Sequence, residues 1–268
     1  MQPTCVNCDS PTTGSQNFCP HCGQKAAVHR LSLHEILHEA IHYFTHADKG
    51  IFPLLKTLAL KPGLVQREYV LGKRKKHFAP LNFFLIVATT FVLISSLPGT
   101  AKDTSTLLSS RRLKIEAMEP GPEKTRLLTM VDRTERSSFF MKKYGNIVAM
   151  AAVPLLSLLF YLFYRKGPYN YTEHLVCNMY INGFSVLCYA LLFLPLAKIF
   201  NLKEFNLLLI LFLVFEVAYR SVSYYHFIGN YTGKAMVKSI VLSITGIVMW
   251  VLISFTVIGL YIERGSFF

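Results

Sequence analysis

The chain has 268 residues, of which 52% are hydrophobic and 16% are charged, and its formal net charge is +13 at pH 7. Soluble globular domains carry about 25% charged residues, so this composition excludes an ordinary soluble domain and favours a protein of the lipid bilayer. The excess of Lys and Arg indicates an anionic partner, either nucleic acid or anionic lipid.

Two Cys-x-x-Cys pairs open the chain, Cys5 with Cys8 and Cys19 with Cys22. Four thiolates at this spacing form the closed tetrahedral set that Zn²⁺ prefers in structural sites. Gly23 follows the second pair and suits a tight turn. Because about two dozen residues cannot bury a core of their own, we expect residues 1–28 to form a zinc ribbon whose folding depends on Zn²⁺.

Other interpretations of this segment stay open: two disulfides, redox pairs, an iron–sulfur site, or His21 in place of one thiolate. A redox pair normally follows a strand of a βαβ unit, and the surroundings of Cys5 and Cys19 do not resemble one. The first residues also lack the basic start and apolar run of a signal peptide. We therefore expect the thiols to stay in the reducing interior of the cell, which favours a metal over disulfides.

Residues 29–79 are expected to form amphipathic helices on the membrane surface. Ser32 can cap the first of them, which carries an apolar stripe on one side. The opposite side carries histidines at four-residue intervals: His34, His38, His42 and His46. This His ladder could chelate a second metal ion, form a solvated and pH-sensitive face, or contact a partner, and all three interpretations stay open.

A basic run, Lys73-Arg74-Lys75-Lys76, abuts the first long apolar stretch. Lys and Arg beside a membrane span are typical of its cytoplasmic end, so we expect the N-terminal segment to face the cytoplasm. Within the ribbon, from Cys5 to Lys25, the only Lys or Arg is Lys25, and no phosphate-binding face is visible there. The basic run therefore favours attraction to anionic lipid headgroups and argues against a nucleic-acid partner.

Three motifs near the N-terminus stand out as a combination. They are Phe18-Cys19-Pro20-His21-Cys22-Gly23-Gln24, the pair Pro62-Gly63, and Arg67-Glu68-Tyr69-Val70-x-Gly72-Lys73-Arg74-Lys75-x-His77-Phe78-x-Pro80. This combination resembles a bacterial family of membrane proteins known as domain of unknown function 3667. The resemblance implies a zinc-ribbon-like head, a segment that docks at the first span, and several transmembrane helices in the bacterial inner membrane. It implies no activity, substrate or catalytic residue.

Five segments approach or reach the roughly 20 apolar residues that a helix needs to cross a bilayer. They cover residues 80–97, 145–164, 175–197, 202–219 and 236–262. The predicted fold is therefore an all-α membrane protein, with a bundle of about five transmembrane helices over residues 80–268. The first and fourth segments are short, so a count of one more or one fewer stays open.

Residues 98–144 are expected to form a polar loop with two short surface helices on either side of Pro120-Gly121-Pro122. With five spans, this loop and the C-terminal tail lie outside the cell. Basic residues in the loop, such as Arg111 and Arg112, are an objection to that placement, because acidic neighbours contribute little to the positive-inside rule.

Ionisable residues inside spans are costly and therefore mark candidate functional sites. Six polar residues lie in or beside the third and fourth spans, where helical spacing can bring them to one seam: Glu173, His174, Asn178, Asn182, Glu216 and Arg220. This polar seam can fix the bundle by interhelical hydrogen bonds, conduct protons or a small solute, or catalyse a reaction. It lacks the carboxylate set or His-x-x-x-His pattern of intramembrane hydrolysis, so we expect no enzyme.

The sequence thus predicts a non-enzymatic membrane adaptor or sensor whose cytoplasmic zinc ribbon engages a protein partner. Two alternatives stay open. The first is a small-solute or proton-coupled transporter that uses the polar seam, and the second is a metal-responsive membrane protein that uses the His ladder.

Overall fold

A computed structural model of the chain describes residues 3–13, 16–36, 50–95, 104–199 and 205–264. Within these ranges the regular secondary structure is helical, with two isolated β-bridges in the N-terminal head and no strand. The helices are α2 (Ile51–Leu60), α3 (Leu64–Val70), α4 (Pro80–Ser95), α5 (Thr104–Glu116), α6 (Pro122–Phe163), α7 (Tyr171–Cys188), the π-helix η1 (Tyr189–Phe193), α8 (Leu194–Ile199), α9 (Phe205–Ile228) and α10 (Gly233–Arg264). The predicted all-helical fold is confirmed for these residues.

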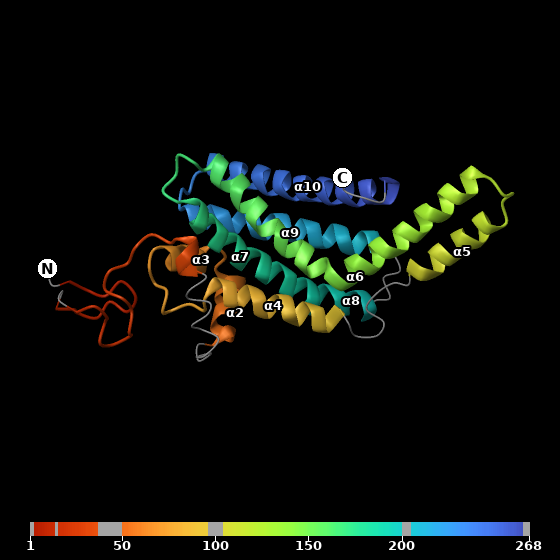
Figure 1. The fold of residues 1–268 in the computed structure, drawn as a ribbon. Helices are drawn as coiled ribbons and strands as arrows, with labels where there is room; N and C mark the ends of the chain where they lie inside the picture. Colours follow the sequence, from red (N-terminus) through yellow and green to blue (C-terminus); the bar gives the residue numbers. More distant parts are fainter. Residues whose placement is uncertain (1–2, 14–15, 37–49, 96–103, 200–204, 265–268) are drawn as a thin grey trace.

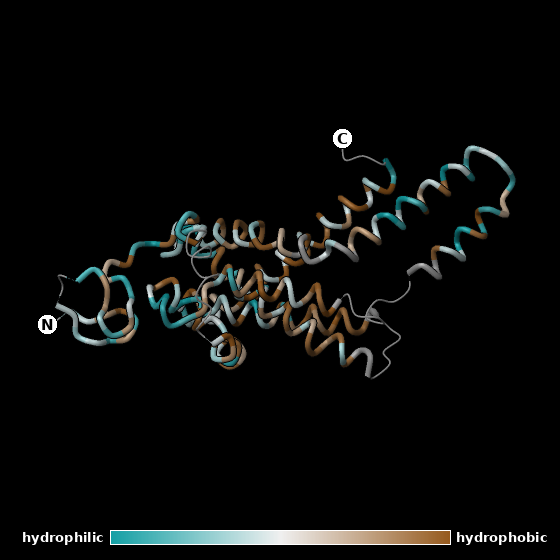
Figure 2. The backbone as a smooth tube through the Cα atoms, turned by 60° about the horizontal axis from the view of Figure 1, so that its bottom comes forward, coloured by the Kyte–Doolittle hydropathy of each residue, from teal (hydrophilic) through white to brown (hydrophobic). Residues whose placement is uncertain are grey.

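The long helices lie side by side in one bundle, and α7 is at its centre, packed against α4, α6 and α9 (Figure 1). Helices α2 and α3 and the N-terminal head lie at one end of this bundle, which we call the head end. The opposite end, from which α5 and the first part of α6 project, is the far end. Hydrophobic residues gather along the bundle helices, whereas the head and the tip of the projecting hairpin are mostly hydrophilic (Figure 2).

Among the described residues, three helical segments are long and apolar enough to cross a membrane: Tyr171–Leu196, Leu207–Ile228 and Gly233–Arg264. They overlap the last three predicted spans. The first two predicted spans correspond to shorter apolar helical segments, Pro80–Ile94 and Met150–Phe163. The chain is therefore compatible with a membrane protein on the length and composition of its helices.

The predicted end of the fourth span at Tyr219 is wrong, because α9 continues through Arg220 to Ile228. A cation normally marks the edge of a span, which is why the sequence indicated a boundary there. In the structure the Arg220 side chain is 0% exposed and is surrounded by hydrogen-bond acceptors. A buried and well-paired charge does not need to reach water, so the helix can continue past Arg220.

The predicted polar loop at 98–144 is corrected in its second half. Helices α5 and α6 do flank the turn at Gly121, and the Arg112 guanidinium pairs with the Asp132 carboxylate across the hairpin. However, α6 runs unbroken for 42 residues, so the predicted start of the second span at Gly145 falls inside a helix. One glycine inside a helix costs only about 1 kcal/mol relative to Ala, too little to interrupt a helix of this length.

The relative direction of α6 and α10 follows from two contacts, one near the start of α10 and one near its end. Lys238 Nζ, near the start of α10, donates to the Phe163 carbonyl at 2.7 Å. At the other end, Arg133 Nη1 donates to the Ile262 carbonyl at 3.1 Å. These two helices are therefore antiparallel, and α10 ends at the far end of the bundle (Figure 1).

The turn before α3 packs directly on α9 through Gly63, whose φ of 88° is in the left-handed region. A Cβ atom at this position would lie 2.4 Å from the Ser223 carbonyl oxygen. Tyr219 completes the contact, because its hydroxyl donates to the Leu58 carbonyl at 3.1 Å. The short helices at the head end are thus fixed to the bundle rather than lying loosely beside it.

Candidate metal centre and its attachment to the bundle

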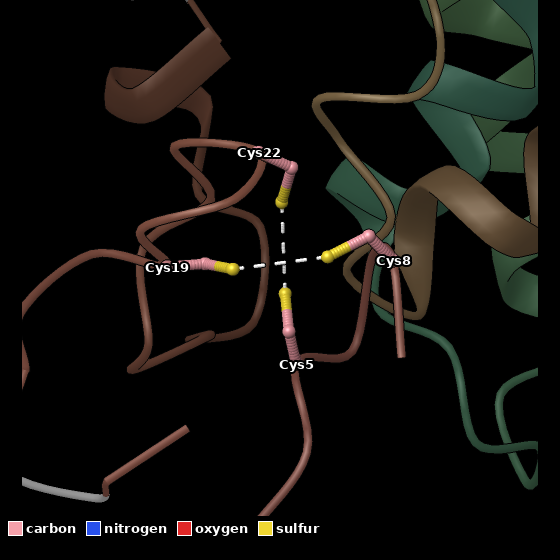
Figure 3. A group of neighbouring side chains, drawn as sticks. All are labelled: Cys5, Cys8, Cys19 and Cys22. Atoms are coloured by element: carbon pink, nitrogen blue, oxygen red, sulfur yellow. Dashed lines mark hydrogen bonds between the residues drawn. The ribbon is translucent and has the colours of Figure 1, made fainter. Parts of the chain in front are cut away.

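The four N-terminal cysteines converge on one point. Their Sγ atoms all lie within 4.8 Å of one another, and the group does not include His21 (Figure 3). The Cys5–Cys22 and Cys8–Cys19 Sγ distances are both 3.7 Å. Zn–S bonds of about 2.3 Å give a tetrahedron with edges of about 3.8 Å, whereas a disulfide requires about 2.05 Å. All four thiols are free, and their spacing fits a single tetrahedral metal ion.

The two Cys-x-x-Cys turns have the same backbone geometry. In the first, Asp9 N–H donates to the Cys5 carbonyl and Cys5 N–H donates to the Ser10 carbonyl, both at 2.9 Å. In the second, Gly23 N–H donates to the Cys19 carbonyl at 2.9 Å and Cys19 N–H to the Gln24 carbonyl at 2.7 Å. This repeated turn is what aims both thiols of each pair at the common centre.

The residue after each pair is in the left-handed region, Asp9 with φ of 58° and Gly23 with φ of 68°. Glycine adopts this conformation without steric cost, and Asp is one of the few other residues that tolerate it. The sequence indicated a turn at Gly23. It gave no comparable signal for Asp9, which becomes recognisable only because both turns are the same.

The two thiols of the first pair differ in acidity. Burial raises the pKa of the Cys5 thiol to about 11. The hydrogen bond between Cys8 Sγ and Ser10 Oγ, 3.3 Å long, together with the Ser10 backbone, lowers the pKa of Cys8 to about 6. A metal ion at this centre holds all four sulfurs as thiolates, so its binding releases protons, most directly from Cys5.

The basic run holds the head, which comprises residues 3–28, through its backbone. Lys76 N–H donates to Asn7 Oδ1 at 3.0 Å and Lys75 N–H donates to Gln24 Oε1 at 3.2 Å. Asn7 lies between the first two cysteines and Gln24 directly follows the second turn. The segment that leads into α4 therefore contacts both halves of the metal centre.

Glu68 on α3 collects the side chains of the same run. Lys76 Nζ donates to its carboxylate at 2.8 Å, Lys73 Nζ at 3.3 Å, and His77 Nε2 lies 2.7 Å from Oε2. Partial burial would raise the pKa of Glu68, but these three partners outweigh it and lower the pKa to about 2. Burial lowers the pKa of His77, and the Glu68 contact opposes this only in part.

This Glu68 cluster bears on the predicted membrane-surface run, residues 73–76. Lys73 and Lys76 form ion pairs with Glu68, and Arg74 Nη2 donates to the His29 carbonyl. The run is therefore the joint between the head and α4, and the interaction with lipid headgroups expected from the sequence stays a prediction.

A second joint connects the residues that directly follow the head, Arg30 and Leu31, to α7. Arg30 Nη2 lies 3.0 Å from Glu173 Oε2, and Asn170 Nδ2 donates to the Leu31 carbonyl at 3.2 Å. Asn170 and Glu173 also form the capping box that begins α7: Glu173 N–H donates to Asn170 Oδ1 at 2.8 Å and Asn170 N–H to Glu173 Oε2 at 2.6 Å. Neither this cap nor the pairing with Arg30 was predicted from the sequence, although Asn followed three residues later by Glu is a capping-box pattern.

Four of the six predicted seam residues come together in the bundle. Arg220 donates from Nη1 to Asn178 Oδ1 at 2.7 Å, and from Nη2 to Asn182 Oδ1 at 2.6 Å and to Glu216 Oε1 at 2.7 Å. Two further members were not predicted from the sequence, Ser157 and Tyr224, whose oxygens accept from Asn178 Nδ2 at 3.1 Å and 2.6 Å. The seam thus joins α6, α7 and α9 around a single buried guanidinium.

The other two predicted members lie elsewhere. Glu173 pairs with Arg30, as described above, and is not part of the seam. His174 is 0% exposed and lies among the rings of five aromatic side chains: Tyr161, Tyr164, Tyr169, Tyr224 and Phe227. Neither of its ring nitrogens has a hydrogen-bond partner in the described part of the chain.

Only the first residue of the predicted His ladder can be placed. His34 is exposed at the start of a helix in which Glu35 N–H donates to Ser32 Oγ at 3.3 Å. His38, His42 and His46 lie outside the described residues, so the hypothesis of a second metal site stays a prediction.

Comparison with known proteins bears on the joint rather than on the cysteines. Residues 48–92 match the model of the family described as "Protein of unknown function (DUF3667)", which confirms the family resemblance. The matched segment contains α2, α3 and most of α4, and with them the Glu68 cluster. No curated protein and no solved structure matches the chain.

Proposed function

We propose that the chain is a multi-pass protein of the bacterial inner membrane whose N-terminal head is a cytoplasmic zinc ribbon. In this proposal the protein is a non-enzymatic adaptor or sensor, and the head engages a protein partner. The observation that carries the proposal is the pair of joints that connect the four-cysteine head to the bundle, at Lys75 and Lys76 and at Arg30 and Glu173.

The joints give the metal a route to the membrane part. A segment of this size folds only when its metal is bound, because it has too little apolar surface for a core. Asn7 and Gln24 are positioned by the two metal-binding turns, so their bonds to Lys76 and Lys75 depend on the same folding event. Metal loss would therefore release the head from the segment that leads into α4.

Five membrane crossings fit the arrangement of the helices. If α4, α6, α7 with α8, α9 and α10 each cross once, the head and the loops at 164–170 and 229–232 lie on one side. The α5–α6 hairpin and the end of α10 then lie on the other. In this arrangement the exposed rings of Phe139 and Phe140 on α6, 66% and 50% exposed, would face lipid.

Zinc is the ion that the donor set favours. Four thiolates at tetrahedral spacing suit Zn²⁺ in a structural site, and the closed set leaves no position for a substrate. The test is elemental analysis of the full-length protein purified without added metal. One zinc per chain that is lost in Cys19→Ser supports the proposal, and a protein free of transition metal contradicts it.

Transport is the second candidate, and the orphaned nitrogens of His174 favour it. A buried imidazole without a hydrogen-bond partner in the described part of the chain, one helical turn from Asn178, can belong to a path for protons or a small polar solute. One pair of variants distinguishes the two candidates. An adaptor loses its function in Cys19→Ser and keeps it in Glu216→Gln. A transporter keeps its function in Cys19→Ser and loses it in Glu216→Gln, with transport measured as proton or solute flux into proteoliposomes.

The metal-responsive alternative depends on a second zinc. It requires a second equivalent that disappears when His38 and His42 are changed to Ala while the first remains. Titration of the apoprotein with Zn²⁺ measures both equivalents directly.

A further inference from the structure

A cavity of ≈ 470 Å³ lies between the head and the segment that leads into α4. One wall includes Lys25 and Val28 of the head and His34 just after it, and the other wall includes Tyr69, Arg74 and Ala79. Phe18, which is 56% exposed, also lines it. The cavity is therefore formed by the docking of the head and belongs to neither part alone.

The charges around the cavity favour an anion. Among the described residues that line it, Lys25, Arg74 and Lys75 are permanent cations and Glu35 is the one carboxylate. That carboxylate is already engaged, because Ser32 N–H and Ser32 Oγ donate to Glu35 Oε2 at 3.1 Å and 3.3 Å. The Glu68 carboxylate does not line the cavity and is neutralised by its own partners.

Arg74 is held in place with hydrogen-bonding capacity to spare. Its Nη2 donates to the His29 carbonyl, which fixes the guanidinium beside the cavity. Its Nε is buried and has no hydrogen-bond partner within the described ranges. A buried donor without an acceptor is costly, and an oxyanion beside the guanidinium would reduce that cost.

The shape and position of the cavity suit a phosphate carried on a larger molecule. Phe18, Val28 and Ala79 add an apolar wall beside the cations. Ala79 directly precedes Pro80, where the first apolar helix begins, so the cavity opens near the level at which a headgroup phosphate would lie.

We propose that this cavity binds a phosphate group, supplied either by an anionic phospholipid headgroup or by a free phosphorylated small molecule. Lys25 and Lys75 provide the long-range attraction, and Arg74 provides the directional contact. The phosphate site depends only on the cavity and its charges. The lipid form rests in addition on the proposed cytoplasmic, membrane-facing position of the head.

The test uses the full-length protein in an uncharged detergent. Binding is measured by isothermal titration calorimetry with two probes, inorganic phosphate and a soluble short-chain phosphatidylglycerol. The main variant is Lys25→Gln with Lys75→Gln. Its matched control is Lys56→Gln with Lys61→Gln, which removes the same charge from two exposed lysines outside the cavity. Ala27→Trp fills the cavity without changing its charge.

We expect the main variant to weaken binding by about fivefold for each lysine removed. Ala27→Trp should also weaken it, and the control pair should change it by less than about twofold. Loss of affinity for phosphatidylglycerol alone identifies a headgroup site, and equal loss for inorganic phosphate identifies a site for a free phosphate. The proposal is overturned if neither probe binds, or if the main variant and the control lose the same affinity.

Zinc content measured on the same samples separates this inference from the proposed function. If the protein holds zinc but its phosphate affinity does not change in Lys25→Gln with Lys75→Gln, only the phosphate site is contradicted. A protein without zinc contradicts the proposed head, whatever the outcome of the titration.

Discussion

Arg30 and Glu173 are 143 positions apart in sequence, yet they form an ion pair with an N–O distance of 3.0 Å. Glu173 is almost fully buried, with 4% of its side chain exposed, whereas Arg30 is 63% exposed. The same carboxylate also accepts from Asn170 N–H and so begins the central helix of the bundle. One side chain thus serves both the helix cap and the attachment of the head.

Loosening this pair should free the head without unfolding the bundle. We expect Glu173→Gln to keep the cap, because the amide oxygen can still accept, and to weaken the joint by less than about 1 kcal/mol, since Arg30 is exposed and screened. Hydrogen exchange of the amides at residues 29–31 measures the effect. Arg30→Gln should give the same increase and the double variant no more, and additive increases would contradict a direct pair.

The left-handed positions after each cysteine pair give a matched test of the metal centre. Gly23→Ala should weaken zinc affinity by about 1 kcal/mol, or about fivefold, through backbone strain alone, because no atom lies within 4 Å of the added Cβ. Asp9→Gly should keep or raise the affinity, because glycine relieves the same strain. Competition with a chromophoric chelator measures both, and weakening by Asp9→Gly would argue against equivalent turns.

Acid should loosen the joint at Glu68 with a defined sign. The pKa of Glu68 is lowered to about 2 from a usual 4.5, so its stabilising effect is fully present above pH 4.5 and is lost as the pH falls towards 2. Zinc release in acid affects the wild type and Glu68→Gln alike, so the difference between them is the informative quantity. We expect exchange of the Lys75 and Lys76 amides to be faster in Glu68→Gln at pH 7, with the difference shrinking as the pH falls below 4.5 and disappearing near pH 2. A constant difference would contradict this account.

The buried guanidinium of Arg220 should be critical for the stability of the bundle. Arg220→Met leaves the Glu216 carboxylate without its cation, and we expect a loss of about 3 kcal/mol in the free energy of unfolding. Adding Glu216→Gln to that variant should restore part of the loss, because the uncompensated charge is gone. Thermal unfolding in detergent measures both, and a double variant less stable than Arg220→Met would contradict the pairing.

Much of the local chemistry could be predicted from the sequence. The cysteine spacing indicated a shared metal centre, and the four-residue spacing of Asn178 with Asn182 and of Glu216 with Arg220 indicated two polar helix faces. These patterns are short-range, and helix or turn geometry converts them directly into neighbouring positions in space.

Contacts between distant segments could not be predicted in this way. Nothing in the sequence pairs Arg30 with Glu173 or Lys76 with Asn7, because such contacts depend on how the head packs against the bundle. The span boundaries failed for a related reason. Arg220 was interpreted as the edge of a span, whereas tertiary partners allow its charge to stay buried inside α9.

The central claim is that a bound metal ion folds the head and thereby attaches it to the bundle. The most direct measurement is hydrogen exchange at the Lys75 and Lys76 amides in the zinc-loaded protein, before and after removal of zinc by a chelator. The account predicts one zinc per chain, and a loss of protection at both amides when it is removed while α9 stays protected. Equal protection with and without zinc, in a protein shown to have released its metal, would contradict it.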